Sequence, residues 1–220
     1  VDFLKDKPYR MLEDLAIFYK VLISKDANGT GTITVTNNHM EYWGLTEEQL
    51  YETAIKNSNV LEPPSIDRLT NVMADLMRAQ GMDEDIIENQ LKEDDIDMYV
   101  ISNTTKANGA SVIVYSDALQ QVAENLGSDL YILPSSIHEV LALPVGNKDV
   151  DSLEEMVRCV NQTEVSPTEV LSDNVYKYDA ESRTLSLASA KAETVKETAV
   201  CEPSGYTGTA NEVARPRHHR

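Results

Sequence analysis

The stretch that decides the fold is residues 128–143, which read SDLYILPSSIHEVLAL. Two apolar runs, 129–133 and 137–143, flank Pro134-Ser-Ser136, a combination typical of a tight turn. Successive side chains are apolar from Leu130 to Leu133 and from Val140 to Leu143, so each strand would be apolar on both of its faces there. Strands of this kind lie inside a sheet rather than at its edge. We therefore predict a central hairpin, with Leu130 and Ile132 on one face of the sheet and Tyr131 and Leu133 on the other.

The same connection contains the candidate catalytic residues of the chain. Ser135, Ser136, His138 and Glu139 supply the residue types of a nucleophilic centre, which needs a serine beside a base that a third group orients. In one strand, however, His138 and Glu139 would point to opposite faces. Neither serine stands in a Gly-x-Ser-x-Gly elbow. We interpret Ser135 and Ser136 as the hairpin connection and His138 as a half-buried structural residue, with catalysis as the alternative.

Outward from this hairpin, the pattern alternates between strands and capped helices. Strands are predicted at 13–24, 32–36, 98–102, 111–115, 174–179 and 184–187. Helices are predicted from Asn37 or Asn38 to Trp43, from Thr46, from Ser65 to Gly81, around Ile86 to Leu91, from Ser116 to Gly127 and from Ser152. The helix from Ser152 is expected to turn Leu153, Met156, Val157 and Val160 inward.

Two Ala-Asn-Gly turns, at 27–29 and 107–109, each stand between predicted strands and precede a helix that ends at glycine. This similarity suggests an internal duplication of a hairpin and a helix. Strands grouped in hairpins and separated by helices favour an α+β fold with a largely antiparallel sheet. We expect one α+β domain over residues 1–187. Residues 188–220 have few large apolar side chains and are expected to be a disordered tail.

Charge is distributed unevenly over the 220 residues. The net charge is −18, and residues 188–220 contribute +1, so residues 1–187 carry −19. A body this acidic repels phosphate, and we expect no nucleic-acid partner. No apolar run approaches the length of a membrane span, and the N-terminus lacks the layout of a secretory signal. Two cysteines, Cys159 and Cys201, provide no disulfide framework, which favours the cytoplasm.

The acidic run from Glu93 to Asp97 is the candidate metal site. Asp94, Asp95 and Asp97 could hold magnesium in a nuclease, although such a run is more often a solvated loop. The four histidines and two cysteines are not spaced as zinc ligands. We expect no metal and no cofactor. The aromatic residues Tyr42, Trp43 and Tyr51 are predicted to pack at an edge of the core.

Several blocks together resemble a known family. They are TVTN at 34–37, YWGLTEEQLY at 42–51, NGA at 108–110, GSDLYILPSSIHEV at 127–140 and TEVSPTEVLS at 163–172. Over about residues 8–187 the chain is similar to an uncharacterised bacterial family, a domain of unknown function, and looks like its C-terminal part. The Pro…His-x-Val-Leu pattern and the following helix resemble a second uncharacterised bacterial family more faintly. The resemblance implies a fold and a bacterial cytoplasm, and it transfers no catalytic residue.

We expect a non-enzymatic intracellular binding or regulatory accessory protein, with a protein partner that has a basic surface. The alternative is a hydrolase or metal-dependent nuclease that uses the Ser135 to Glu139 connection or the aspartates at 94, 95 and 97. A basic partner follows from the acidic body, although solubility alone would also explain the charge.

Overall fold

A computed structural model of the chain describes residues 2–26, 29–93, 97–146 and 148–189. The chain divides into two units, residues 1–190 and 191–220. The expected disordered tail lies outside the described residues, apart from residues 188 and 189. The backbone N–H of Ala188 donates to the carbonyl of Val175.

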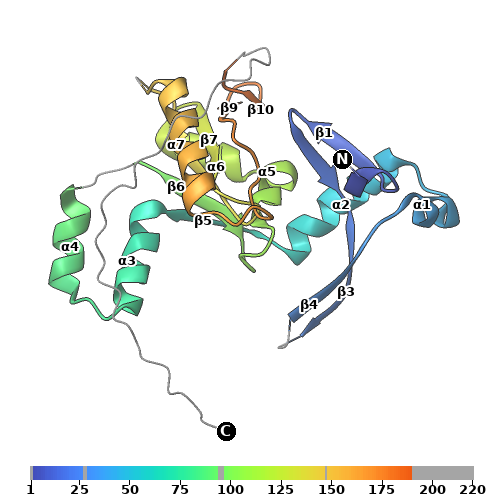
Figure 1. Cartoon of the computed structure of the whole chain (residues 1–220), viewed down its shortest axis with the longest axis horizontal. Helices are drawn as coiled ribbons and strands as arrows, with labels where there is room; N and C mark the ends of the chain where they lie inside the picture. Colours follow the sequence, from blue (N-terminus) through green and yellow to red (C-terminus); the bar gives the residue numbers. More distant parts are fainter. Residues whose placement is uncertain (1, 27–28, 94–96, 147, 190–220) are drawn as a thin grey trace, which may run out of the picture. The chain divides into compact units, whose positions relative to one another are not determined.

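Six strands form one antiparallel sheet in the order β10-β9-β7-β8-β6-β5. Figure 1 labels β5, β6, β7, β9 and β10 of this sheet. Their bounds are Pro64–Arg68 for β5, Tyr99–Asn103 for β6, Leu130–Pro134 for β7, Val140–Pro144 for β8, Tyr176–Asp179 for β9 and Thr184–Leu187 for β10. The predicted hairpin is the pair β7 and β8, and it is central, with two strands on either side. The α+β class with a largely antiparallel sheet is therefore confirmed.

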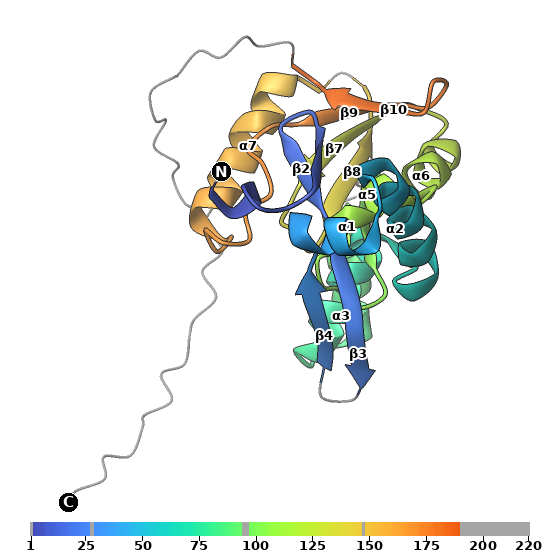
Figure 2. The same cartoon turned by 90° about the vertical axis from the view of Figure 1, so that its right-hand side faces the viewer.

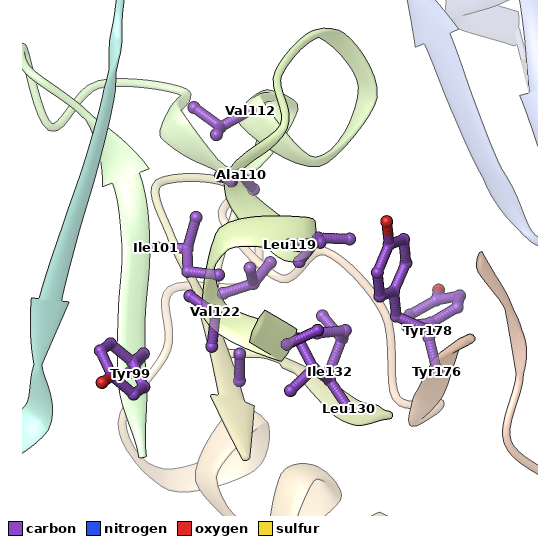
Figure 3. Packing of buried hydrophobic residues seen from close by; sticks show 14 of the residues in the cluster. Tyr99, Ile101, Ala110, Val112, Leu119, Val122, Leu130, Ile132, Tyr176 and Tyr178 are labelled. Carbon is purple, nitrogen blue, oxygen red and sulfur yellow. The ribbon is translucent and has the colours of Figure 1, made fainter. Parts of the chain in front are cut away.

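Each face of this sheet carries its own core, as the apolar alternation predicts. Leu130 and Ile132 belong to one buried cluster together with residues of α5 (Val112–Tyr115) and α6 (Ala118–Leu126). In Figure 3, Leu119 and Val122 of α6 lie against Ile101 and Ile132 of the sheet. Tyr131 and Leu133 belong to a second cluster, together with Leu153 and Val157 of α7 (Val150–Thr163).

The residues before β5 form two hairpins and two helices. Their elements are a 3-10 turn at Asp2–Leu4, β1 at Tyr9–Leu12, β2 at Leu15–Phe18, β3 at Lys20–Asp26, β4 at Gly29–Thr34, α1 at Asn37–Trp43 and α2 at Glu47–Leu61. The strands β1 and β2 form one two-stranded sheet, and β3 and β4 form another, which Figure 2 shows as a long ribbon. A small core of Tyr19, Val35 and Met40 packs against α2.

Local signals place the ends of α1 and α2. Thr46 accepts a hydrogen bond from the backbone N–H of Gln49, whose side chain accepts one from the Thr46 N–H, and this confirms the predicted capping box. Gly44 ends α1 with a φ of 66°, a conformation that glycine adopts without strain. The N-cap of α1 is Thr36, not Asn37 or Asn38 as predicted, because the Thr36 N–H donates to Nδ1 of His39.

The predicted duplication is wrong. Residues 111–115, expected as a strand, form the end of a 3-10 turn (Gly109–Ser111) and the short helix α5. The second Ala-Asn-Gly turn therefore joins a strand to a helix, whereas the first lies in the β3–β4 hairpin, with residues 27 and 28 outside the described part. Val112 and Tyr115 are buried on the sheet, and this packing overrides the strand propensity of Ser-Val-Ile-Val-Tyr.

Two further predictions of element type are corrected. Residues 64–68 form the edge strand β5, and the helix expected from Ser65 begins only at α3 (Leu69–Ala79). Pairing of β5 with β6 overrides the helical spacing there. The strand expected at 13–24 begins only at Leu15, because the chain turns from β1 into β2 at Glu13, whose φ is 53°. It is also interrupted at Tyr19, which separates β2 from β3. The predicted acidic helix is α4 (Glu84–Glu93).

The helix α7 begins before its predicted cap. Asp149 is the N-cap and accepts a hydrogen bond of 3.1 Å from the backbone N–H of Ser152. Leu153 and Val157 are buried as predicted, but Met156 and Val160 are exposed. The buried face instead includes Glu154 and Asn161, which polarity alone would have placed outside. No helix of the described residues is long and apolar enough to cross a membrane.

Candidate functional site

The connection between β7 and β8, residues 135–139, closes on itself through Ser136. The backbone N–H of Ser136 donates to the carbonyl of Glu139 over 3.2 Å, and the Ser136 hydroxyl accepts from the N–H of His138 over 3.0 Å. Ser135 and Ser136 therefore form the predicted hairpin connection. His138 and Glu139 lie in this connection and not in a strand, so strand alternation does not decide where they point.

The imidazole of His138 joins this connection to two distant segments. The backbone N–H of Asn108 donates to Nδ1 over 3.2 Å, and Nε2 lies 3.5 Å from a carboxylate oxygen of Glu169. Because Nδ1 accepts, the neutral ring carries its proton on Nε2, facing Glu169. The side chain of His138 is 37% exposed, so the ring is half-buried, as predicted.

Beneath the ring, the backbone of Gly109 lies against β6 and the connection. The hydroxyl of Ser102, a fully buried residue, donates to the His138 carbonyl over 2.7 Å. A Cβ atom on Gly109 would lie 2.1 Å from the Ser102 Oγ and 2.5 Å from the His138 carbonyl oxygen. Glycine is therefore required here by close approach of the backbone.

The loop between β6 and Gly109 is held by Asn103, whose side chain is fully hydrogen-bonded. Its amide donates to the carbonyl of Ala107 over 2.9 Å and to Glu62 over 3.3 Å. Its oxygen accepts from the backbone and hydroxyl of Thr105. Within this loop Lys106 and Asn108 adopt left-handed conformations, with φ of 56° and 51°. A satisfied buried amide of this kind specifies one loop conformation.

This arrangement does not bring the four candidate catalytic residues into a triad. Among the described residues no serine hydroxyl bonds the His138 ring, and the carboxylate beside that ring belongs to Glu169, not Glu139. The side chains of Ser135 and Glu139 make no hydrogen bond within the described part of the chain. Asn108 and Glu169, each about 30 residues from His138 in sequence, carry no local signal that could have identified them as its partners.

The candidate metal site is only partly described. Asp94 and Asp95 lie outside the described residues, and Asp97 pairs with Arg68 over 3.7 Å. Over the described ranges, no group of three or more His, Cys, Asp or Glu side chains is placed to hold a metal ion.

A cavity of about 290 Å³ lies beside α3. It is lined by Asp67, Asn71, Val72, Asp75, Leu76 and Lys106. The charged groups already have partners, since Lys106 pairs with Asp67 and Asp75 pairs with Arg78. The cavity therefore offers a ligand little uncompensated charge.

Two polar clusters that the sequence does not reveal hold the N-terminal hairpins. The carboxylate of Asp14, in the β1–β2 turn, accepts from the Tyr176 hydroxyl (2.6 Å), the Ser172 hydroxyl (2.7 Å) and the Asn174 amide (3.1 Å). We call this group the Asp14 clasp. Burial, reinforced by the bond to Asp14, raises the pKa of Tyr176 above its ordinary range.

The second cluster surrounds Arg10 of β1. Its guanidinium pairs with Glu47 over 2.8 Å and with Glu48, and it lies 3.9 Å from the centre of the Tyr51 ring. The hydroxyl of Tyr19 also donates to Glu47. The hydrogen bond from Arg10 lowers the pKa of Glu47 below its ordinary value, against the smaller effect of burial.

The first 45 residues expose most of the large apolar side chains. Nine of the sixteen such exposed side chains in the described residues lie there: Phe3, Tyr9, Met11, Val21, Ile23, Ile33, Tyr42, Trp43 and Leu45. Tyr42 is 89% exposed and Trp43 41%, so their predicted place in a core edge is wrong. Tyr51 is half-buried and packs against the small N-terminal core. The same 45 residues hold five Lys or Arg and six Asp or Glu, whereas residues 46–187 hold nine Lys or Arg and 27 Asp or Glu.

Comparison with the curated proteins and with the solved structures gives no match. A family model does match, over residues 1–180, which includes every cluster described above. The match covers all the sequence blocks that resemble a domain of unknown function, and the chain belongs to the family of unknown function DUF5688.

Proposed function

We propose that this chain is a non-enzymatic intracellular protein that binds a protein partner through residues 2–45. The observation that carries the proposal is the exposure of nine large apolar side chains in this nearly neutral segment. Apolar and aromatic residues that remain accessible in a folded chain are typical of interaction surfaces. The intracellular location is supported by the two cysteines, which provide no disulfide framework.

Tyr42 and Trp43 are the best candidates for the centre of this surface. Tyrosine and tryptophan are the residue types most often found to dominate binding energy. Trp43 stacks on His39, with 5.4 Å between ring centres, so its ring is held in place before a partner arrives. A pre-ordered aromatic side chain loses less entropy on binding.

The charge distribution indicates the kind of partner. Residues 46–187 carry a net charge of −18, against −1 for residues 1–45. A partner with an apolar patch flanked by Lys and Arg would be attracted by the acidic residues and would bury the neutral segment. The function proposed is therefore recognition of a basic protein surface with an apolar centre.

The geometry of the 135–139 connection supports a structural role for it. The Ser136 hydroxyl is engaged by the His138 backbone, and the His138 ring bridges Asn108 and Glu169. A hydrolase would need a nucleophile within reach of that ring. Binding is accordingly the function that we favour.

Photo-crosslinking tests the proposal. Benzoylphenylalanine replaces Tyr42, and as a matched control it replaces Met156, which is 43% exposed on α7. Irradiation of cells that produce the protein should give a discrete adduct from position 42 and none from position 156. Trp43→Ser should remove the adduct, and the captured protein should be basic. No adduct at position 42, or the same adduct at both positions, would contradict the proposal.

A further inference from the structure

Among the described residues, no strand lies next to the outer edge of β4. The strands β3 and β4 form a two-stranded sheet, and β3 is the one described strand with which β4 pairs (Figure 2). Thr30, Thr32 and Ile33 of β4 are exposed. A two-stranded ribbon is only marginally stable alone, and an unpaired edge is a template for a further strand.

The register shows which backbone groups of β4 point outward. The N–H of Val35 donates to the carbonyl of Tyr19 over 2.9 Å. Because hydrogen-bonded pairs alternate along an antiparallel ladder, Ile33, two residues earlier, also directs its N–H and C=O groups toward β3. The bulge lies in β3, between Leu22 and Ser24, so β4 itself keeps a regular alternation. Thr30, Thr32 and Thr34 therefore direct their N–H and C=O groups away from β3.

This edge lacks the features that usually prevent pairing. Proteins protect edge strands with charged residues, proline or bulges. The opposite edge of the ribbon, β3, has a bulge as well as Lys20 and Lys25. The edge strand β5 begins at Pro64 and ends at Arg68. The six residues of β4, Gly-Thr-Gly-Thr-Ile-Thr, include none of these devices.

We propose that β4 pairs antiparallel with β4 of a second copy of this chain, centred on Thr32. Hydrogen bonds between the two copies form only where residues whose N–H and C=O groups point away from β3 face each other. Centring the pairing on Thr32 places all three such threonines of β4 opposite one another. Thr32 then faces Thr32 of the second copy, and Thr30 of each copy faces Thr34 of the other. This arrangement gives three residue pairs, each with two hydrogen bonds. The two ribbons become one four-stranded sheet with two-fold symmetry.

The side chains suit this symmetric pairing. Ile33, which is 51% exposed, comes to lie opposite Gly31 of the second copy, where no side chain obstructs it. Val21 faces Ile33 across the ribbon and is also exposed, and the Ile33 side chains of the two copies become diagonal neighbours on that face of the sheet. The facing threonines are uncharged and β-branched, which favours strand pairing on both sides.

Charge favours a second copy at this place over residues 46–187. Two copies with a net charge of −18 repel each other, and the acidic residues lie mainly after residue 45. Residues 20–34 carry Lys20, Lys25 and Asp26, a net charge of +1. The ribbon is thus where two copies can approach without bringing their acidic residues together. This proposal goes beyond the proposed binding function: it shares Val21 and Ile33 with the surface proposed there, but it does not involve Tyr42 or Trp43.

Sedimentation equilibrium of the full chain over a range of concentrations tests the pairing. The monomer mass is 24.5 kDa, and the wild type should approach twice this value as concentration rises. Thr32→Pro removes an outward N–H without disturbing the bonds to β3, because proline is tolerated on that side of an edge strand. It should weaken the dimer at least about tenfold, since two of the hydrogen bonds are lost. Thr32→Val keeps the backbone N–H and should dimerise like the wild type.

The outcomes separate this proposal from its alternatives. A wild-type chain that stays monomeric at every concentration overturns it, and so does a dimer that Thr32→Pro leaves intact. If the circular dichroism spectrum shows that Thr32→Pro does not fold, the variant Thr32→Lys is measured instead, because a charged side chain on the edge should also prevent pairing. Amide exchange adds a direct readout: the N–H groups of Thr30, Thr32 and Thr34 should become protected as concentration rises. Loss of the Tyr42 adduct alone would not affect these results.

Discussion

The Asp14 clasp should contribute measurably to stability, and Asp14→Ala tests this. The Tyr176 residue is 1% exposed, and its hydroxyl loses its carboxylate partner in this variant. A buried hydroxyl without a partner costs about 1–3 kcal/mol. Ser172 and Asn174 are nearer to water and add less. We expect a decrease in the free energy of unfolding of about 2 kcal/mol, and about 1 kcal/mol for Asp14→Asn, which keeps one acceptor oxygen.

Urea denaturation followed by circular dichroism measures these values. Glu41→Ala is the matched control, since it removes an exposed carboxylate from α1 and should change the free energy of unfolding by less than about 0.5 kcal/mol. A double-mutant cycle with Tyr176→Phe should give a coupling energy of about 1 kcal/mol, because both single changes remove the same hydrogen bond. A loss for Asp14→Ala no larger than that of the control, or a coupling energy of zero, would refute the clasp.

Further predictions concern the connection and the Arg10 cluster. Gly109→Ala should lower the free energy of unfolding by more than about 3 kcal/mol, because its Cβ would lie 2.1 Å from a buried hydroxyl, whereas Gly146→Ala, with nothing within 4 Å, should have little effect in the same denaturation assay. His138→Ala should cost about 1 kcal/mol, the value of one partly buried hydrogen bond, and should leave partner crosslinking unchanged. The pKa of Glu47 is lower in the folded chain than in the unfolded chain. Its contribution to the free energy of unfolding is therefore fully present above its pKa in the unfolded chain, and it is lost as pH falls through its pKa in the folded chain. The melting temperature should therefore fall on acidification below about pH 5, and Glu47→Gln should show a smaller fall; equal falls in both proteins would argue against this pairing with Arg10.

Features that depend on nearby residues could be predicted from the sequence. Gly44 ends α1 and Gly127 ends α6 in the left-handed conformation, and Thr46 with Gln49 caps α2. Each is a matter of a few adjacent residues and the hydrogen bonds that they can make. The central hairpin could be predicted for a similar reason, because burial on both faces leaves an apolar pattern within the strands themselves.

Features that depend on distant partners could not be predicted. Residues 64–68 have helical spacing but pair with β6 over 30 residues away, and that pairing decides their conformation. The same holds at the candidate site, where the sequence predicts a half-buried His138 but does not indicate its partners. Asn108 is held there by a loop conformation that Asn103 imposes, and Glu169 reaches the ring from beyond α7. Nothing in the order of residues along the chain indicates that these segments meet.

The strand order has a consequence for how the protein is made. The strand β7 has β8 on one side and β9 on the other, and β9 ends at Asp179. A ribosome synthesises the chain from its N-terminus, so one edge of β7, a fully buried strand, stays open until β9 has emerged. Long-range antiparallel pairing of this kind also slows folding. Completion of the sheet is therefore a late event in biosynthesis, and a polypeptide truncated before β9 would present the open edge of β7 to chaperones and to other nascent chains.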